Sequence, residues 1–199
     1  AICEATGANV NEVANAIGKD TRIGTKFLKA GPGFGGSCFK KDILNLVYLA
    51  KYYGLNEVAD FWKNVVEINK WQQKRIYQAI VKRMFGNLAD KKISILGFAF
   101  KENTNDTRES PSIAICKYLI NEGAFLSIHD EKVSEDNIRK ELTINQSEAE
   151  AEAFDIEYKI NWEFQIDIYS TIKNADAVIL LTQWEIYKKL DWKKISLEV

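Results

Sequence analysis

The stretch Lys91-Lys-Ile-Ser-Ile-Leu-Gly97 decides the fold class of this 199-residue chain. Its mainly apolar run has the character of a short strand buried on both faces of a sheet. Ser110-Pro111 follows, with serine as N-cap and proline at the first helical position, and it predicts a helix over residues 112–121. A second strand is expected over residues 124–129. Strand, helix and strand in this order predict a parallel α/β domain.

The same alternation continues toward the end of the chain. Ala177–Thr182 contains the run Val-Ile-Leu-Leu and is expected to form a third strand. Stretches that favour helix surround it, over residues 168–174 and 184–196. Residues 145–166 are acidic and poorly periodic, and we interpret them as a solvated loop or an insertion without a chemical role.

The first half of the chain is expected to be helical. The apolar spacing changes character near residues 86–91, which predicts a helical central domain over residues 1–88. An α/β domain, incomplete at its end, is expected over residues 89–199. The helices expected in the first half cover residues 2–17, 40–53 and 56–85, and each is followed by a glycine that is expected to end it.

The helix expected over residues 56–85 is unusually long. At 1.5 Å per residue it would span about 45 Å, which exceeds the need of one small domain. A helix of this length is typical of a segment that joins two domains or pairs with its copy in a dimer. A single long helix in a monomeric bundle is the alternative.

Composition excludes several function classes. The chain has 27 basic and 28 acidic residues and a formal charge of -1, which argues against nucleic acid as the main partner. The three cysteines are far apart and lack metal-site spacing, so neither a disulfide framework nor a zinc site is expected. Reduced thiols fit the cytoplasm. No signal peptide or membrane span is expected.

Gly31, Gly33 and Gly36 satisfy the pattern G-x-G-x-x-G, but the context does not fit a dinucleotide-binding fold. That fold requires a strand before the glycines, and Thr25–Lys29 is not a strand. Glycines still allow main-chain N–H groups to approach a ligand closely, so the loop could hold phosphate or sugar hydroxyls. A tight turn between helices is the alternative.

Cys38 lies where this loop enters the next helix. A helix N-terminus and the nearby Lys40 and Lys41 favour a reactive thiolate. Asp42 follows one helical turn later on the same face, where a carboxylate could position or deprotonate water. The pattern indicates covalent catalysis. An inert thiol is the alternative, and it is our interpretation of the other two cysteines.

Two cations follow the strand near Ile93. Lys101 and Arg108 are expected beyond its carboxyl end and before the next helix, where α/β sheets bind anions. A pair of solvated surface cations is the alternative. His129, the only histidine, is given no role.

Seven short segments stand out: Phe27-Leu-Lys-Ala30, Gly33-Phe-Gly-Gly-Ser-Cys-Phe39, Lys41-Asp42, Asn45-Leu-Val-Tyr48, Ile95-Leu-Gly-Phe-Ala-Phe-Lys101, Asp106-Thr-Arg-Glu-Ser110 and Leu181-Thr-Gln-Trp-Glu185. Together they resemble the UDP-glucose/GDP-mannose dehydrogenase family, and in particular its members that oxidise UDP-glucose. The glycine–cysteine motif is the most specific of them.

The resemblance implies an activity and a set of site residues. Such enzymes oxidise the C6 alcohol of UDP-glucose to a carboxylate with two NAD⁺, through an aldehyde and a thioester on cysteine. The implied catalytic residues are Cys38, the nucleophile, and Asp42, near the catalytic water. The implied substrate-binding residues are Arg22, which reaches across a homodimer, and Lys29, Ala30, Gly31, Pro32, Gly33, Phe34, Gly35, Phe100 and Lys101. The implied NAD-binding residues are Cys38, Phe39, Lys40, Lys41 and Arg108.

The resemblance also implies that other parts of the enzyme are needed. Ala1 begins inside an expected helix and Val199 ends without a cap, so we expect a longer parent protein. The family's NAD-binding N-terminal domain has no counterpart in these residues, and the chain alone is not expected to turn over. Two alternatives stay open: a non-catalytic module that binds nucleotide sugars, and a sister enzyme acting on GDP-mannose or a UDP-N-acetyl sugar.

Overall fold

A computed structural model describes residues 1–143 and 161–196, which fall into two compact units, Ala1–Gly31 and Pro32–Val199. The first unit holds helices α1 (Ile2–Thr6) and α2 (Val10–Gly18). A single helix over residues 2–17 was expected, and this prediction was wrong. Gly7 ends α1 with φ +75°, a conformation that glycine adopts at little cost, and Asn9 then caps α2 by accepting the N–H of Asn11.

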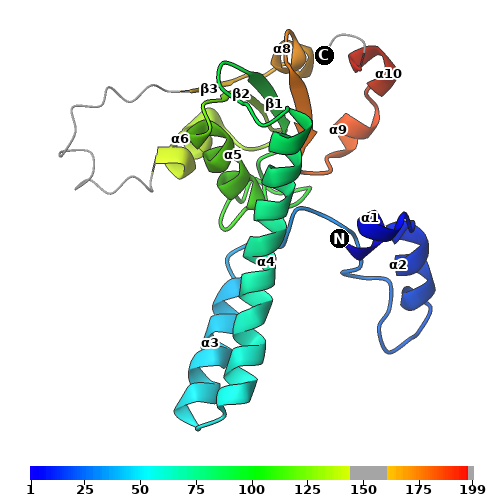
Figure 1. The fold of residues 1–199 in the computed structure, drawn as a ribbon, viewed down its shortest axis with the longest axis vertical. Helices are drawn as coiled ribbons and strands as arrows, with labels where there is room; N and C mark the ends of the chain where they lie inside the picture. Colours follow the sequence, from blue (N-terminus) through cyan, green and yellow to red (C-terminus); the bar gives the residue numbers. More distant parts are fainter. Residues whose placement is uncertain (144–160, 197–199) are drawn as a thin grey trace, which may run out of the picture. The chain divides into compact units, whose positions relative to one another are not determined.

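The second unit begins with a helical hairpin. Helix α3 (Phe39–Tyr52) and helix α4 (Asn56–Arg83) lie side by side (Figure 1) and are joined by a turn at Gly54 with φ +74°. These bounds confirm the two helices expected there, and α4 ends two residues earlier than predicted. The hairpin has a small core of its own, made by Val47, Ala50 and Ala59.

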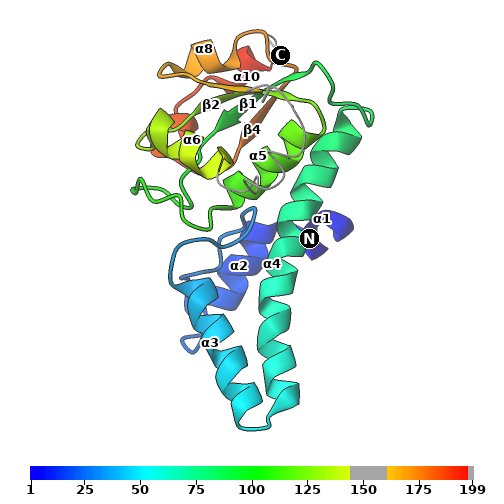
Figure 2. The same ribbon diagram turned by 90° about the vertical axis from the view of Figure 1, so that its left-hand side faces the viewer.

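The remainder of the second unit is an α/β body built on a parallel sheet, which confirms the expected fold class. The strands lie in the order β3-β2-β1-β4. Helices α5 and α6 cover one face of the sheet and α8 lies on the other (Figure 2), as right-handed crossovers require. The elements are β1 (Lys92–Leu96), α5 (Pro111–Asn121), β2 (Phe125–His129), α6 (Glu135–Thr143), β3 (Trp162–Phe164), α8 (Ile168–Ile172), β4 (Ala177–Leu180), α9 (Glu185–Lys188) and α10 (Trp192–Ile195).

Residues 145–166 were expected to form a loop throughout, and strand β3 shows that this prediction was wrong at their end. Residues 144–160 lie outside the described part of the chain, but Trp162–Phe164 pairs in parallel with β2. Trp162 is 9% exposed and joins the main core. A single buried tryptophan therefore anchors a three-residue strand that is too short to produce a recognisable alternating pattern.

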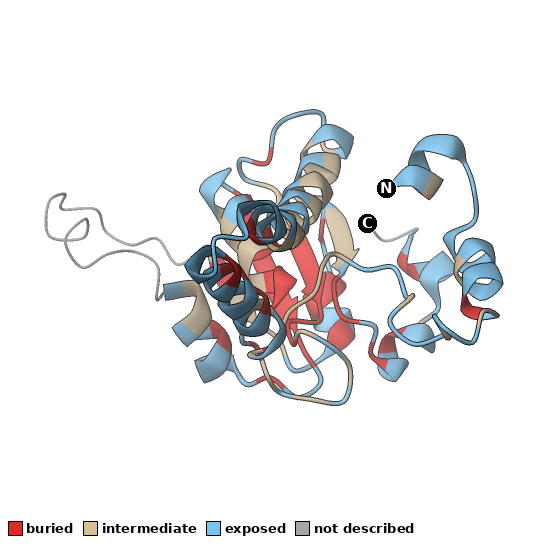
Figure 3. Cartoon of the chain, turned by 90° about the horizontal axis from the view of Figure 1, so that it is seen from below, coloured by how far each residue is buried: buried red, intermediate tan, exposed pale blue. Residues whose placement is uncertain are grey.

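The main hydrophobic core lies in the sheet and under α5. Figure 3 shows the buried residues concentrated on the strands. Ser110 caps α5 as expected, because its side chain accepts the N–H of Ser112 while Pro111 occupies the first turn. Among residues 1–143 and 161–196, no helix combines the length and the apolar character needed to cross a membrane.

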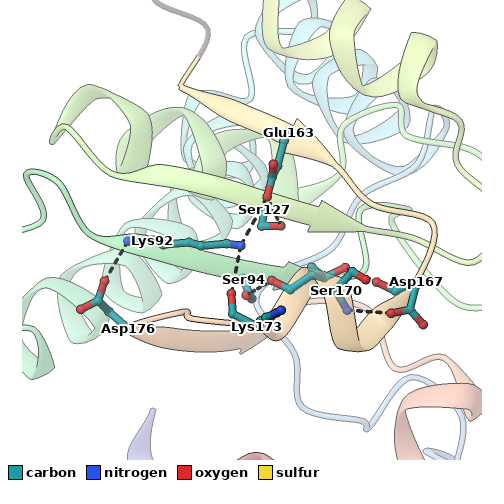
Figure 4. Close-up of polar contacts among 9 residues, drawn as sticks. Lys92, Ser94, Ser127, Glu163, Asp167, Ser170, Lys173 and Asp176 are labelled. Carbon is teal, nitrogen blue, oxygen red and sulfur yellow. Dashed lines mark hydrogen bonds and ion pairs between the residues drawn. The ribbon is translucent and has the colours of Figure 1, made fainter. Parts of the chain in front are cut away.

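Polar contacts fix the amino ends of the strands and the connection from α8 to β4 (Figure 4). Lys92 Nζ donates to the carbonyl of Lys173 at 3.0 Å and lies 3.4 Å from Glu163 Oε1. Asp176 accepts the main-chain N–H of Lys92 at 2.9 Å. Ser94, buried on the same face, donates to the carbonyl of Thr171 in α8 at 2.6 Å. These bonds hold β4 beside β1, so the carboxyl ends of β1, β2 and β4 meet at one edge.

Candidate functional site

Cys38 occupies the N-cap position of α3 with an exposed side chain, at the entry to the helix where it was expected. The Asp42 N–H donates to the Cys38 carbonyl at 2.9 Å, which places the Asp42 carboxylate one helical turn further along. Ser37 Oγ lies 3.6 Å from Cys38 Sγ. Cys116, in contrast, is fully buried, and burial raises the pKa of its thiol. Cys38 is therefore the reactive candidate and Cys116 is inert.

The glycine loop from Pro32 to Ser37 is held on one side by α4. The Phe34 N–H donates to Asn69 Oδ1 at 2.9 Å, and Asn69 Nδ2 donates to the Phe34 carbonyl at 3.0 Å. A Cβ on Gly33 would lie 2.7 Å from Asn69 Oδ1, so only glycine fits there. Asn69 is a site residue that the sequence analysis missed, since its partner is 35 residues away.

On its other side the loop lies against the segment that follows β1. A Cβ on Gly35 would lie 2.5 Å from the Glu109 carbonyl oxygen and 2.9 Å from Phe100 Cβ. The Gly36 N–H donates to the Arg108 carbonyl at 2.9 Å. The loop is thus confined between two elements rather than closed on itself as a tight turn. The main-chain N–H groups of Phe34 and Gly36 already donate hydrogen bonds within the protein, so fewer amides of the loop can hold a phosphate than expected.

Carboxylates pair with two of the expected cations. Arg108 forms a bidentate contact with Asp106, with Nη2 2.7 Å from Oδ2 and Nε 3.0 Å from Oδ1. The hydrogen bond to Asp106, together with the charge of Asp106, raises the pKa of Arg108. Lys40 Nζ forms an ion pair with Glu109 at 2.7 Å. Both cations are therefore paired within the chain, and Arg108 stays 65% exposed.

The segment after β1 is fixed by a buried carboxylate, Asp130. Its Oδ2 accepts the N–H groups of Phe98 at 2.7 Å and Ala99 at 3.1 Å, together with Trp184 Nε1 at 3.1 Å. Thr182 Oγ1 donates to the Ala99 carbonyl at 2.6 Å. Asp130 was not predicted from the sequence, although its position immediately after a strand was a usable signal.

This rigid segment presents Phe100 and Lys101. The Phe100 N–H donates to the Asp106 carbonyl at 3.1 Å, and Lys101 Nζ lies 5.3 Å from the centre of the Phe100 ring. The Phe100 ring also borders the position that a Gly36 Cβ would take, at 3.1 Å. Phe100 and Arg108 therefore lie against the glycine loop, and Lys101 lies over the Phe100 ring.

The remaining residues expected in the site differ in their surroundings. Phe39 is 51% exposed and meets the Phe34 ring edge-on at 4.7 Å, and Lys41 is exposed. Arg22 belongs to the first compact unit and pairs with Asp20, with Nη2 2.6 Å from Oδ2. This bond lowers the pKa of Asp20 and raises the pKa of Arg22. The other expected site residues in that unit are Lys29, Ala30 and Gly31.

His129, which was given no role, lies at the carboxyl end of β2. Its Nδ1 is 2.7 Å from the hydroxyl of Tyr187, and that hydroxyl is 3.1 Å from the His129 carbonyl oxygen. Both residues are buried, and burial lowers the pKa of His129. The pair lies beside Asp130 and ties α9 to the sheet, which is a structural role.

Comparison with known proteins identifies the family. Residues 94–199 match the UDP binding domain of the UDP-glucose/GDP-mannose dehydrogenase family, and residues 1–71 match its central domain. The chain belongs to this family. Its helical hairpin with Cys38 lies largely in the central-domain match, whereas Lys101 and Arg108 lie in the UDP-binding match.

Curated relatives carry the name UDP-glucose 6-dehydrogenase. UDP-glucose 6-dehydrogenase 3 of Arabidopsis thaliana is 47% identical over 206 residues, covering 98% of this chain and 42% of the relative. UDP-glucose 6-dehydrogenase 2 of Oryza sativa subsp. japonica is 44% identical over 203 residues, covering 98% of this chain and 41% of the relative. The chain thus spans about two fifths of the length of these relatives.

Solved structures of the family share the fold. A UDP-glucose dehydrogenase from Pyrobaculum islandicum superposes with a TM-score of 0.78 at 29% identity, over 94% of this chain and 39% of that one. A UDP-D-ManNAc dehydrogenase from Pyrococcus horikoshii gives 0.69 at 21% identity, over 99% of this chain and 40% of that one. At this lower identity the second likeness concerns the fold alone.

Proposed function

We propose that this chain is part of an NAD-dependent enzyme that oxidises UDP-glucose to UDP-glucuronate, with Cys38 as the nucleophile. One observation carries the proposal: an exposed thiol at the N-terminus of α3, on a loop confined between α4 and the segment after β1, in a chain 47% identical to UDP-glucose 6-dehydrogenases. We place the enzyme in the cytoplasm.

The proposed reaction consists of two oxidations and a final hydrolysis. Oxidation of the C6 alcohol to an aldehyde removes a hydride and a proton. The Cys38 thiolate then adds to the aldehyde carbon, and the aldehyde oxygen takes up a proton to give a thiohemiacetal. Loss of a second hydride, together with the hydroxyl proton, gives a thioester. Water attacks the thioester carbonyl, and the C–S bond breaks to release the carboxylate and the thiol. NAD⁺ supplies the hydride acceptor in both oxidations.

Asp42 suits the final step. It lies one helical turn from Cys38 and is exposed, so its carboxylate has access to solvent water. A carboxylate there can orient the attacking water and take its proton as the thioester is hydrolysed. The proposed role predicts that the neutral variant Asp42→Asn slows hydrolysis more than it slows the earlier steps.

We propose a set of contacts to the substrate. Phe100 and Lys101, presented by the segment held by Asp130, would contact the UDP-sugar, with the ammonium group of Lys101 opposite its negative charge. The other proposed contacts are Arg22, Lys29, Ala30, Gly31, Pro32, Gly33, Phe34 and Gly35. We also propose that Arg22 reaches the sugar nucleotide of a second copy.

The described residues fit one wall of an NAD site. Cys38, Phe39, Lys41 and Arg108 are exposed and could border the nicotinamide end, as could Lys40 beside them. The pyrophosphate of a dinucleotide usually binds main-chain amides that follow the first strand of such a sheet. Within residues 1–143 and 161–196 the amides after β1 fit poorly, because two of them donate to Asp130. We therefore propose that the main NAD-binding domain is a separate part of the parent.

We further propose a domain boundary near residues 86–91 and a homodimer or higher oligomer formed through α4. The hairpin exposes several large apolar side chains to solvent, and exposed apolar surface of this kind marks sites of protein–protein contact. Among them, Phe61 is 63% exposed, Ile68 59% and Trp71 48%. Light scattering that shows only a monomer would remove the support for this assembly.

The experiment that tests the proposed function uses the longer enzyme that contains this chain. NADH formation is measured with UDP-glucose, GDP-mannose and a UDP-N-acetyl sugar, for the wild type and for Cys38→Ala. We expect turnover of UDP-glucose above the others, and its loss in Cys38→Ala but not in the matched control Cys3→Ala. Normal turnover by Cys38→Ala would refute the role of Cys38, and preferred turnover of another sugar would assign a sister activity.

A further inference from the structure

Asn69 binds the nucleophile loop from the middle of α4. Its side-chain amide makes two hydrogen bonds to one residue, accepting the Phe34 N–H at 2.9 Å and donating to the Phe34 carbonyl at 3.0 Å. The amide group thus pairs with the main chain as a neighbouring strand would. Both main-chain polar groups of Phe34 are satisfied by this one side chain.

The shape of the loop is matched to Asn69. Gly33 has φ +142°, and a Cβ there would lie 2.7 Å from Asn69 Oδ1 and 3.5 Å from Gln73 Cγ. The close approach that glycine permits brings Phe34 within reach of the amide. On the far side, a Cβ on Gly35 would lie 2.5 Å from the Glu109 carbonyl oxygen and 2.9 Å from Phe100 Cβ, so the segment after β1 leaves the loop little room to move away from Asn69.

Phe34, which Asn69 holds in place, is connected to Cys38 through the main chain and through a side-chain contact. Phe34 precedes Cys38 by four residues. Its ring meets the ring of Phe39 edge-on, at 4.7 Å and 88°. Phe39 is the first residue of α3 and follows Cys38 directly. Cys38 therefore lies between two positions that Asn69 restrains.

We propose that Asn69 is a positioning residue, which holds the Cys38 thiol where it attacks the substrate carbonyl. The kinetic consequence rests on the proposed dehydrogenase function, whereas the restraint on the loop does not. A reacting atom displaced by about 1 Å can lose about 100-fold in rate. We therefore expect Asn69→Ala to lower kcat by about 10- to 100-fold.

The restraint is tested first in the 199-residue chain. Asn69→Ala is compared with Asn64→Ala, an exposed asparagine of the same helix. We expect hydrogen exchange at the Phe34 amide to speed up at least tenfold in Asn69→Ala only. The rate at which iodoacetamide alkylates Cys38 should also change at least threefold, because the thiol is no longer held at the start of α3, while Cys3 in the same sample reacts at an unchanged rate.

A milder variant guards against loss of folding. Asn69→Asp has the same shape and still accepts the Phe34 N–H, but it cannot donate to the Phe34 carbonyl. It is expected to retain the melting temperature within a few degrees and to show effects between those of the wild type and Asn69→Ala. Unchanged exchange and unchanged alkylation in both variants would overturn the proposal.

The kinetic part uses the longer enzyme. A tenfold or greater fall in kcat for Asn69→Ala, an intermediate fall for Asn69→Asp and a change below twofold for Asn64→Ala would support the positioning role. Faster exchange at Phe34 with a wild-type kcat would overturn it and leave Asn69 as a structural residue. If the wild-type enzyme does not oxidise UDP-glucose, the proposed function fails, and exchange and alkylation still decide whether Asn69 positions Cys38.

Discussion

Replacing Asp130 with asparagine should destabilise the α/β body although the two side chains have the same shape. The carboxylate is 5% exposed and accepts five hydrogen bonds. Oδ2 accepts from Phe98, Ala99 and Trp184, and Oδ1 accepts from the N–H groups of Lys132 and Val133, both at 2.9 Å. All five partners are donors, so an amide NH₂ group at either position faces only other donors.

The size of the effect follows from this geometry. In the less harmful orientation the NH₂ group faces two N–H groups, and in the other it faces three. Each buried donor that loses its partner costs about 1–3 kcal/mol. We expect Asp130→Asn to lower the free energy of unfolding by about 3 kcal/mol. For a chain of this size that corresponds to a fall of about 6–12 °C in melting temperature.

The assay is thermal and urea unfolding of the 199-residue chain, followed by circular dichroism and by tryptophan fluorescence. Asp60→Asn, an exposed carboxylate of α4, is the matched control and should change the free energy of unfolding by less than about 0.5 kcal/mol. A value for Asp130→Asn equal to that of the control would refute the view that this carboxylate fixes the segment after β1.

Three further predictions concern stability and thiol access. Burial lowers the pKa of His129 below its usual 6.5. As the pH falls from about 6.5 toward this lowered value, the unfolded chain takes up a proton at His129 and the folded chain does not. The free energy of unfolding should then fall by up to about 1.4 kcal/mol per pH unit in that range, whereas that of His129→Gln should not change with pH there. Urea unfolding at a series of pH values measures both. Gly97→Ala should cost at least about 2 kcal/mol, because Gly97 has φ +95° and a Cβ would lie 2.5 Å from Thr182 Cβ; a wild-type melting temperature would contradict this. Mass spectrometry after brief alkylation of the folded chain should find Cys38 modified and Cys116 untouched, and equal labelling of the two thiols would show that Cys116 is not buried.

Local sequence signals predicted much of the fold. Ser110-Pro111 places the start of α5 correctly because capping and the fixed proline φ depend on neighbouring residues only. Apolar runs likewise placed β1, β2 and β4. The break between α1 and α2 was missed because the helical spacing continues across Gly7. Strand β3 was missed because its stability comes from pairing with β2 and from burial of Trp162, neither of which leaves a periodic pattern.

The site was predictable only in part. The position of Cys38 at a helix start follows from the glycine loop and the helical run after it. Asn69 and the Oδ2 atom of Asp130 bind partners more than 30 residues away, and the sequence alone does not show that these residues lie close together. The pairing of Lys40 with Glu109 is also long-range, so the charge around the thiol could not be worked out from the lysines alone.

The most direct test of Cys38 as the covalent nucleophile is the mass of the peptide that contains it. The longer enzyme, carrying Asp42→Asn to slow hydrolysis, is mixed with UDP-glucose and NAD⁺, quenched in acid within one turnover and digested. The account predicts an added UDP-glucuronyl mass on Cys38 and none on Cys3. Formation of the acid at the normal rate with no adduct on Cys38 would contradict it.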